Sequence, residues 1–252
     1  MARHLFILTG SSRGLGAAML EQLMVPGHTL LGISRTNPPG QRTVAEARGA
    51  RLEHWDADLT EPVGIAARLQ AWLEGFDADE VASATLVNNA ALLTRIGPLD
   101  RGDDGALSAS LRASLEAPLL LSAAFLRATR SWPAPRRVLN ISSGLGRRAM
   151  AGTAAYCAAK AALDHASRAM ALDEAAQPHG ARSVALAPGV IDTDMQVELR
   201  GADADGFPEQ SVFVGLKEGG QLTSAAAAAA RVLAYLERAD FGANPVADVR
   251  DA

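Results

Sequence analysis

Short apolar runs alternate along the chain with longer segments in which apolar residues recur at helical spacing. This alternation is typical of βαβ units, which place parallel strands in one sheet with helices on both of its faces. The pattern therefore predicts a doubly wound α/β fold with a parallel seven-stranded sheet. The expected strands are residues 5–9, 29–34, 51–56, 85–88, 137–142, 183–187 and, more weakly patterned, 246–249.

The expected helices cover residues 15–24, 63–73, 106–129, 154–176 and 224–237. Residues 195–222 break the alternation, because glycines and a proline are scattered there among charges. We interpret this segment as a lid that passes over one rim of the sheet. No linker separates two hydrophobic cores, so residues 1–252 are expected to form a single domain.

Distinctive small and polar residues follow six of the expected strands. In an open parallel sheet, ligands bind beyond the carboxyl ends of the strands, so these residues are expected to share one rim. In chain order they are Thr9-Gly10, Ser34-Arg35, Asp58, Asn88-Asn89-Ala90, Ser142-Ser143 and Pro188-Gly189.

Composition narrows the function classes. The chain is 48% hydrophobic, which suits one substantial core. Its net charge of −4 and pI near 5.7 give no electrostatic reason to bind nucleic acid. The start of the chain has no long apolar segment, so we expect a cytoplasmic protein without a membrane anchor. One cysteine, Cys157, and five scattered histidines predict neither an internal disulfide nor a metal site.

A glycine turn follows the first expected strand. Gly10, Gly14 and Gly16 are spaced Gly-x-x-x-Gly-x-Gly and lead into an expected helix. Glycines allow a tight turn and close backbone approach, and a helix start presents free N–H groups and a positive dipole end to a pyrophosphate. A simple strand-to-helix turn has no use for three glycines at this spacing. The turn therefore indicates a dinucleotide site.

The end of the second strand bears on the choice of cofactor. A carboxylate there would accept hydrogen bonds from the adenosine ribose, but this chain has Ser34-Arg35, with Arg13 in the glycine turn. Two guanidiniums can clamp a 2′-phosphate, so we expect NADP(H). Asp58 has two interpretations: it accepts from the adenine amino group, or it caps the helix that follows.

Tyr156 and Lys160 are four residues apart in an expected helix and so share one face, although the chain has only two tyrosines and two lysines. A free phenol has a pKa of about 10, and a neighbouring ammonium favours its anion. Ser143, at the end of the fifth strand, is expected to face the same rim. A hydroxyl that donates to a carbonyl oxygen, with a phenol that protonates it, suits carbonyl reduction.

These motifs, in this order and spacing, resemble the short-chain dehydrogenase/reductase family over nearly the whole chain. The resemblance implies a Rossmann fold, with Tyr156 as acid/base, Lys160 lowering its pKa and holding the nicotinamide ribose, and Ser143 orienting the carbonyl. It implies that Thr193 and the backbone near Val190 hold the carboxamide, and that Asn88 braces the sheet. The cofactor-binding set that we expect is Gly10, Ser12, Arg13, Gly14, Leu15, Gly16, Ser34, Arg35, Asp58, Asn89, Ala90, Tyr156, Lys160, Pro188, Gly189, Val190 and Thr193.

The segment around residues 192–222 is similar to the sepiapterin reductase and bacterial benzil reductase branch of that family. The expected activity is NADPH-dependent reduction of a ketone or dicarbonyl, either a sepiapterin-like pterin or an aromatic diketone such as benzil. Ser143, Tyr156 and Met195 would contact the substrate. The same resemblance places Asp248 as an anchor for a pterin, whereas its position near the chain end fits a solvated tail carboxylate equally well. Two alternatives remain open: reduction of a 3-oxoacyl thioester, and a non-catalytic regulator that senses NADP(H).

One position departs from the family pattern. Its catalytic asparagine is replaced by Ser114, with Pro118 four residues on. Since proline has no N–H, we expect the Ser114 carbonyl to stay free for the water that links the lysine to solvent. Family resemblance also implies a homodimer or homotetramer built on the fourth and fifth helices, with the leucine-rich stretch 111–126 as a candidate surface.

Overall fold

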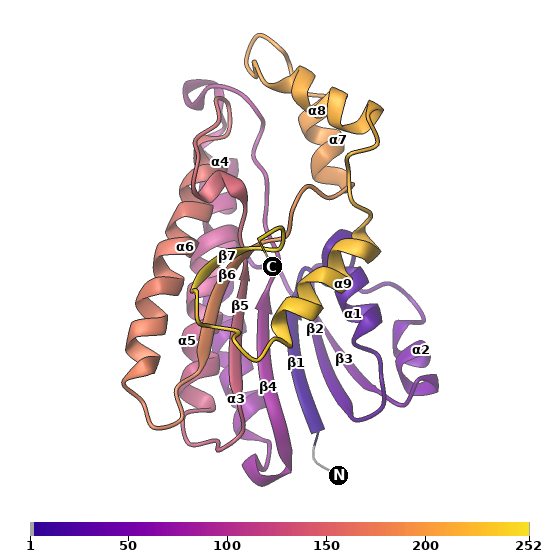
Figure 1. Ribbon diagram of the computed structural model, residues 1–252, viewed down its shortest axis with the longest axis vertical. Helices are drawn as coiled ribbons and strands as arrows, with labels where there is room; N and C mark the ends of the chain where they lie inside the picture. Colours follow the sequence, from indigo (N-terminus) through magenta and orange to yellow (C-terminus); the bar gives the residue numbers. More distant parts are fainter. Residues whose placement is uncertain (1–2, 252) are drawn as a thin grey trace.

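Seven parallel strands form the frame of the computed structural model, which describes residues 3–251 (Figure 1). Their order is β3-β2-β1-β4-β5-β6-β7, and every neighbouring pair is parallel. The order reverses between β1 and β4, where open α/β sheets bind their ligands. The strands are β1 (Arg3–Thr9), β2 (His28–Ser34), β3 (Arg51–Asp56), β4 (Val81–Asn88), β5 (Arg136–Ile141), β6 (Arg182–Ala187) and β7 (Val246–Asp248).

All seven expected strands are confirmed, including the weak last one, and most bounds agree within one or two residues. The largest difference is at β4, which begins at Val81 rather than at residue 85. Its first half, Val-Ala-Ser-Ala, has mostly small side chains, so it gives little hydrophobic signal. Tertiary contacts stabilise it as a strand: Ser83 lies opposite His4 on β1, and its Oγ is 2.8 Å from His4 Nδ1.

Helices connect the strands and end in the expected places, except for three short ones that the sequence did not predict: α2, α7 and α8. The helices are α1 (Gly14–Gln22), α2 (Gln41–Ala47), α3 (Pro62–Glu74), α4 (Asp104–Leu111), α5 (Ala117–Ala128), α6 (Ala154–Ala175), α7 (Asp194–Arg200), α8 (Gln210–Glu218) and α9 (Ala225–Leu236). The short turns are η1 (Ala78–Glu80), η2 (Leu99–Arg101), η3 (Arg112–Glu116) and η4 (Gly144–Gly146).

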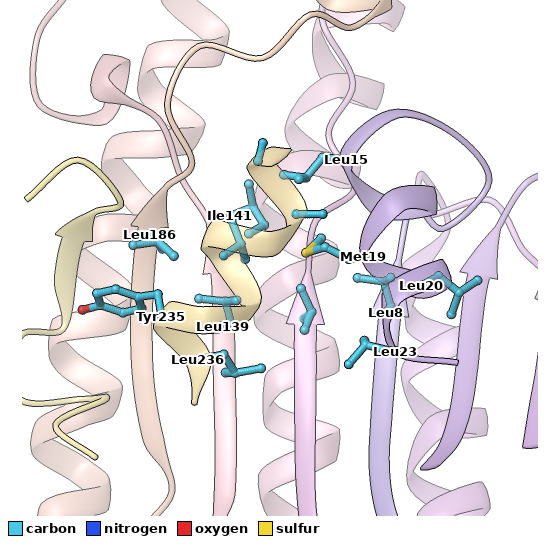
Figure 2. Close-up of a cluster of buried hydrophobic side chains, with 14 of the residues drawn as sticks. Leu8, Leu15, Met19, Leu20, Leu23, Leu139, Ile141, Leu186, Tyr235 and Leu236 are labelled. Atoms are coloured by element: carbon cyan, nitrogen blue, oxygen red, sulfur yellow. The ribbon is translucent and has the colours of Figure 1, made fainter. Parts of the chain in front are cut away.

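Two hydrophobic layers cover the two faces of the sheet. On one face, Leu15 and Met19 of α1 and Leu236 of α9 belong to one buried cluster with the strand residues Leu139 and Leu186 (Figure 2). On the other face, α3 and α5 pack against β1, β2 and β4. Because both faces are covered, most residues of the central strands β1 and β4 are buried.

The long helix expected over residues 106–129 is interrupted. It consists of α4, the π-helical turn η3 and α5, with the N–H of Ala117 donating to the carbonyl of Arg112. Pro118 lacks the N–H that would continue a regular helix there, which favours the wider turn. By length and composition Asp104–Ala128 is apolar enough to cross a membrane, but half of its most apolar window is buried in the second layer, as expected of a core helix.

The segment expected to act as a lid rises beyond the carboxyl ends of the strands and carries α7 and α8 (Figure 1). It has a small core of its own, in which Phe207 stacks on Phe213 with ring centroids 5.6 Å apart and Leu199 and Met150 pack alongside. This cluster anchors the lid to the loop after β5, because Met150 belongs to that loop.

Candidate active site

A cleft of about 730 Å³ opens at the carboxyl ends of the strands, beneath the lid. Strand ends, the glycine turn, α6, the start of the lid and the end of β7 all contribute to its walls. The predicted site residues that line it are Gly10, Ser12, Arg13, Gly14, Leu15, Gly16, Ser34, Arg35, Asp58, Asn89, Ala90, Ser143, Tyr156, Lys160, Pro188, Gly189, Val190, Thr193, Met195 and Asp248. Ser114 is the predicted site residue that does not line it.

The glycine turn has the geometry that a dinucleotide requires. Gly10 and Gly14 have φ of +68° and +55°, and a Cβ on Gly16 would lie 2.1 Å from the carbonyl oxygen of Gly10. Helix α1 begins at Gly14 with no side-chain cap and no acidic residue in its first turn. Its first N–H groups therefore remain available to an anion in the cleft, and these residues fit the pyrophosphate of a nicotinamide cofactor.

Thr9 links the carboxyl end of β1 to that of β4, its neighbour in the sheet. Its Oγ1 accepts the backbone N–H groups of Asn89 and Ala90, both at 3.0 Å. The Asn89 amide donates in return to the carbonyl oxygen of Thr9 at 3.0 Å. These bonds fix the Ala90 backbone beside the glycine turn, where the cofactor was expected to pass.

Arg35 and Arg13 differ in their surroundings at the nucleotide end. Arg35 is exposed and pairs with no carboxylate among residues 3–251. Arg13 instead forms an ion pair with Asp194, the first residue of α7 at the start of the lid, at 2.9 Å between Nη1 and Oδ2. Both partners of that pair are two-thirds exposed, so the pair is weak enough to be exchanged for a phosphate.

Asp58 serves the turn after β3. Its Oδ1 accepts from the Thr60 N–H at 3.0 Å, and that backbone hydrogen bond is the main cause that holds the pKa of Asp58 below its usual value. Asp58 therefore does not cap α3, whose N-cap is Glu61 and which no side chain caps. It fixes the turn before that helix, and its carboxylate lines the cleft.

Tyr156 and Lys160 lie in the first turns of α6 and reach the cleft together. Lys160 is buried, its Nζ donates to the carbonyl oxygen of Ile141 at 2.7 Å, and it lies 5.5 Å from the centre of the Tyr156 ring. Desolvation raises the pKa of the Tyr156 phenol to about 12, against a smaller opposing effect of a hydrogen bond with Ser143. Desolvation outweighs that hydrogen bond, so the net shift of the phenol's pKa is upward in this geometry, and a lowering by Lys160 stays a prediction.

Lys160 is affected by the same burial. Desolvation lowers the pKa of its ammonium to about 8, and the charge of Asp164 partly opposes that shift. Near neutral pH the site thus holds a protonated phenol and a cationic lysine. This is the state in which a phenol can give up a proton.

Ser143 follows the end of β5 by two residues, with extended backbone, and directly precedes the turn η4. Its Oγ accepts from the N–H of Leu145 at 3.1 Å, which leaves the hydroxyl hydrogen free to donate elsewhere. The predicted grouping of Ser143, Tyr156 and Lys160 is therefore present as a set of neighbours on one wall of the cleft.

Ser114 is buried in η3 and faces the segment after β4. Its Oγ accepts from the N–H of Leu92 at 3.0 Å. The side chain therefore fixes the Ala90–Leu92 segment and makes no direct contact with the cleft. A role of its carbonyl in a proton relay stays a prediction, supported by the π-helical turn and by Pro118.

Asp248 is 4% exposed, so the interpretation as a solvated tail carboxylate is wrong. It lies at the end of β7 and forms a two-point ion pair with Arg250, at 2.8 and 2.6 Å. Hydrogen bonds from Arg250 are the main cause that holds its pKa below the usual value. Since β7 pairs with β6, whose end also lines the cleft, the tail is held in the site by the sheet itself.

Several residues of the cleft escaped the sequence analysis. Arg148, Arg250, Leu199 and Phe213 line the substrate side without belonging to any motif. Lys217, for which the sequence suggested no role, pairs with Asp192 at 2.6 Å and ties α8 to the start of the lid. The i, i+2 spacing of Asp248 and Arg250 was the one available signal for that pair.

A family model for short chain dehydrogenases matches residues 4–204. Together with the sheet order and the site, this match shows that the chain belongs to the short-chain dehydrogenase/reductase family of oxidoreductases, which bind a nicotinamide cofactor. Among residues 3–251, no group of three or more His, Cys, Asp or Glu side chains is arranged to hold a metal ion.

Individual relatives are similar over nearly the whole chain. The benzil reductase ((S)-benzoin forming) of Bacillus cereus is 31% identical over 235 residues, which cover 93% of this chain and 94% of that protein. Sepiapterin reductase of Meriones unguiculatus is 30% identical over 256 residues, covering 97% and 95%. The crystal structure of a short-chain dehydrogenase/reductase from Burkholderia vietnamiensis is 35% identical, with a TM-score of 0.67 and coverage of 99% and 98%.

Proposed function

We propose that this protein is an NADPH-dependent carbonyl reductase that acts on a ketone or dicarbonyl, with Tyr156 as its general acid. The observation that carries the proposal is the grouping of Ser143, Tyr156 and buried Lys160 on one wall of a cleft whose opposite wall is the glycine turn. A protein that only senses the cofactor has no need for this grouping.

The residues of the cleft divide the work of the reaction. A reduced nicotinamide, when bound, supplies the hydride. Ser143 donates a hydrogen bond to the substrate's carbonyl oxygen and so holds the carbon in place. Tyr156 gives its phenolic proton to that oxygen as the negative charge develops there. The raised pKa of Tyr156, about 12, keeps this proton on the phenol until the oxyanion, a stronger base, forms.

The preference for NADPH over NADH is supported by charge at the end of β2. Ser34-Arg35 replaces the carboxylate that would bind a ribose hydroxyl, and Arg35 is exposed at the cleft. Arg13 lies in the same cleft, in an exposed ion pair that a 2′-phosphate can displace. Arginine forks suit phosphate geometry, and an acidic side chain in either place would repel it.

The substrate wall favours an aromatic diketone. Leu145, Met150, Met195, Leu199 and Phe213 provide a largely apolar surface next to Ser143 and Tyr156. This surface suits two phenyl rings, as in benzil, the substrate that the relative from Bacillus cereus is named for. A pterin is the second candidate, because the buried carboxylate of Asp248 offers an acceptor to amino groups.

A turnover screen tests the proposal. NADPH oxidation is followed with benzil, a pterin ketone and a 3-oxoacyl thioester, each at several concentrations and with NADH in parallel. We expect turnover with the diketone and a clear preference for NADPH. Tight NADPH binding without oxidation by any carbonyl tested would refute the proposal and favour the regulator. Efficient turnover of the thioester alone would replace the proposed substrate class.

A further inference from the structure

Asp164 is a buried carboxylate that no motif of the sequence included. It lies on α6 one turn after Lys160 and is 2% exposed, as Lys160 is. Its Oδ1 accepts from the Ser142 hydroxyl, and its Oδ2 accepts from Arg147 Nε at 3.3 Å. A charged group at this depth is costly unless it is paired. Ser142 and Arg147 provide the pairing, and the segments that they belong to indicate what Asp164 does.

The Ser142 contact connects Asp164 with the catalytic end of β5. Ser142 stands between Ile141, whose carbonyl oxygen accepts the Lys160 ammonium at 2.7 Å, and Ser143. The turn η4 presses against α6 at the same point: a Cβ on Gly146 would lie 2.9 Å from Asp164 Oδ2 and 3.0 Å from the carbonyl oxygen of Lys160. A glycine is thus needed for this close approach.

The Arg147 contact extends the network to the tail of the chain. While its Nε holds Asp164, its Nη2 donates to the carbonyl oxygen of Ala247 at 3.0 Å. Ala247 precedes Asp248 in β7, the strand that brings the tail into the cleft. One carboxylate is therefore linked both to the end of β5 and to the substrate wall formed by the tail.

We propose that Asp164 is a positioning residue that keeps Lys160 cationic and fixes the end of β5 against the C-terminal wall of the cleft. Its catalytic consequence rests on the proposed function. Tyr156 and Asp164, both on α6, are the titratable groups set against Lys160, and Cys157 follows Tyr156 on the same helix. Arg147 after η4 pairs with Asp164, and Asp248 pairs with Arg250 at the tail. Asp164 is the anion nearest in sequence on the same helix.

Electrostatics supports this role. Burial lowers the pKa of Lys160 to about 8, and Asp164 is the charge that opposes the shift. We expect removal of the carboxylate charge to lower the pKa of Lys160 further. We expect removal of the Arg147 cation, which pairs with Asp164, to raise it, because one nearby positive charge is lost. If Asp164 and Arg147 only stabilised the fold, their substitution would not shift the pKa of Lys160 in opposite directions.

The scarcity of lysine makes a direct test possible. With ¹³C-labelled lysine the chain gives two Cε signals, Lys160 and Lys217, and the Lys217→Arg variant assigns them. We expect Lys160 to titrate near pH 8, about one unit lower in Asp164→Asn, and higher than wild type in Arg147→Gln. Asp173→Asn, an exposed carboxylate on the same helix, is the matched control and should leave both signals unchanged.

The kinetic consequence is measured separately. With benzil and NADPH, the activity of the Asp164→Asn variant should fall at a lower pH than that of the wild type. At pH 8 its kcat should be about fivefold lower, since the expected pKa of Lys160 is about one unit lower in the variant than in the wild type.

An unchanged Lys160 titration in Asp164→Asn and Arg147→Gln would overturn the proposal. If Asp164→Asn fails to fold, the proposal is decided by whether the pKa of Lys160 rises in Arg147→Gln. Absence of wild-type turnover would refute the proposed function, while the lysine titration still tests Asp164.

Discussion

At the scale of single residues, two cations with different surroundings define the nucleotide end of the cleft. Arg35 has no carboxylate partner among residues 3–251, whereas Arg13 is held by Asp194 on the lid. In the proposed function Arg35 is ready for a 2′-phosphate, and Arg13 must exchange its partner first. Arg35 should therefore carry the larger share of the preference for NADPH.

Substitution of Arg35 by aspartate tests this assignment. Loss of a charge-assisted hydrogen bond costs about 1.5–3 kcal/mol, so the KM for NADPH should rise at least about tenfold. The KM for NADH should change little or fall, because the new carboxylate can accept from the ribose. Arg231→Asp, on the exposed side of α9, is the control for net charge. Equal effects on both cofactors would contradict the assignment.

At the scale of elements, a buried ion cluster joins four elements at the end of the sheet opposite the cleft. Glu174 of α6 accepts from Arg130 at 2.6 Å, from Arg136 of β5 at 3.4 Å, and from the N–H of Ala181 before β6 at 2.8 Å. Arg136 and Glu174 are 0% and 3% exposed. The cluster holds the amino ends of β5 and β6 in register with α6.

Glu174→Gln should lower the free energy of unfolding by about 3 kcal/mol, because it leaves the buried guanidinium of Arg136 without its counter-ion. Burial alone would raise the pKa of Glu174, but hydrogen bonds from Arg130 and the Ala181 amide and the charges of both arginines lower it. The contribution is therefore complete above the unfolded pKa of about 4.3 and disappears as pH falls through the lower folded value. Urea unfolding at pH 7 and at pH 3, with Asp173→Asn as control, measures it; an equal difference at both pH values would contradict this account.

The elements were largely predictable from sequence, and the exceptions have identifiable causes. Strand β2 was found almost to the residue because it is buried along nearly its whole length. Strand β3 was found because its buried Leu52 and Trp55 stand among exposed polar positions. Helix α2 was missed since seven residues with one buried side chain, Ala45, give no helical period. The π-helical turn η3 was not predicted. Pro118 indicated only that the Ser114 carbonyl lacks its usual N–H partner, and local sequence does not specify how the helix adjusts to that.

At the scale of the whole molecule, the cleft depends on segments that are far apart in sequence. The glycine turn, the start of α6, the lid and the tail meet only because the strand order places β1 beside β4 and β7 beside β6. Motif spacing therefore predicted Tyr156, Lys160 and the glycine turn. It did not predict the partners Asp194 and Asp164, because the folded sheet must bring two segments together for each of these pairs. The pair of Asp248 with Arg250 is local, and only its i, i+2 spacing indicated it.

The buried tail yields a prediction at this scale. Asp248→Ala should raise the KM for a pterin about tenfold or more, the loss expected when an amino group loses a charged acceptor, and should leave the KM for benzil within about twofold. Asp251→Ala, which alters an exposed carboxylate three residues on, is the matched control. Steady-state kinetics with both substrates measures the difference. Equal changes for both would assign Asp248 to the structure of the tail alone.

The two tyrosines allow the most direct test of the proposed chemistry. NADPH oxidation with benzil is measured for the wild type, for Tyr156→Phe and for Tyr235→Phe, which alters the other tyrosine, in the α9 layer far from the catalytic wall. NADPH affinity is measured in parallel by fluorescence. The account predicts that Tyr156→Phe lowers kcat by at least about 10²-fold, which is the contribution expected of a general acid, and that it retains the affinity for NADPH. The kcat of Tyr235→Phe should stay near that of the wild type. Turnover by Tyr156→Phe at the wild-type rate would contradict the account.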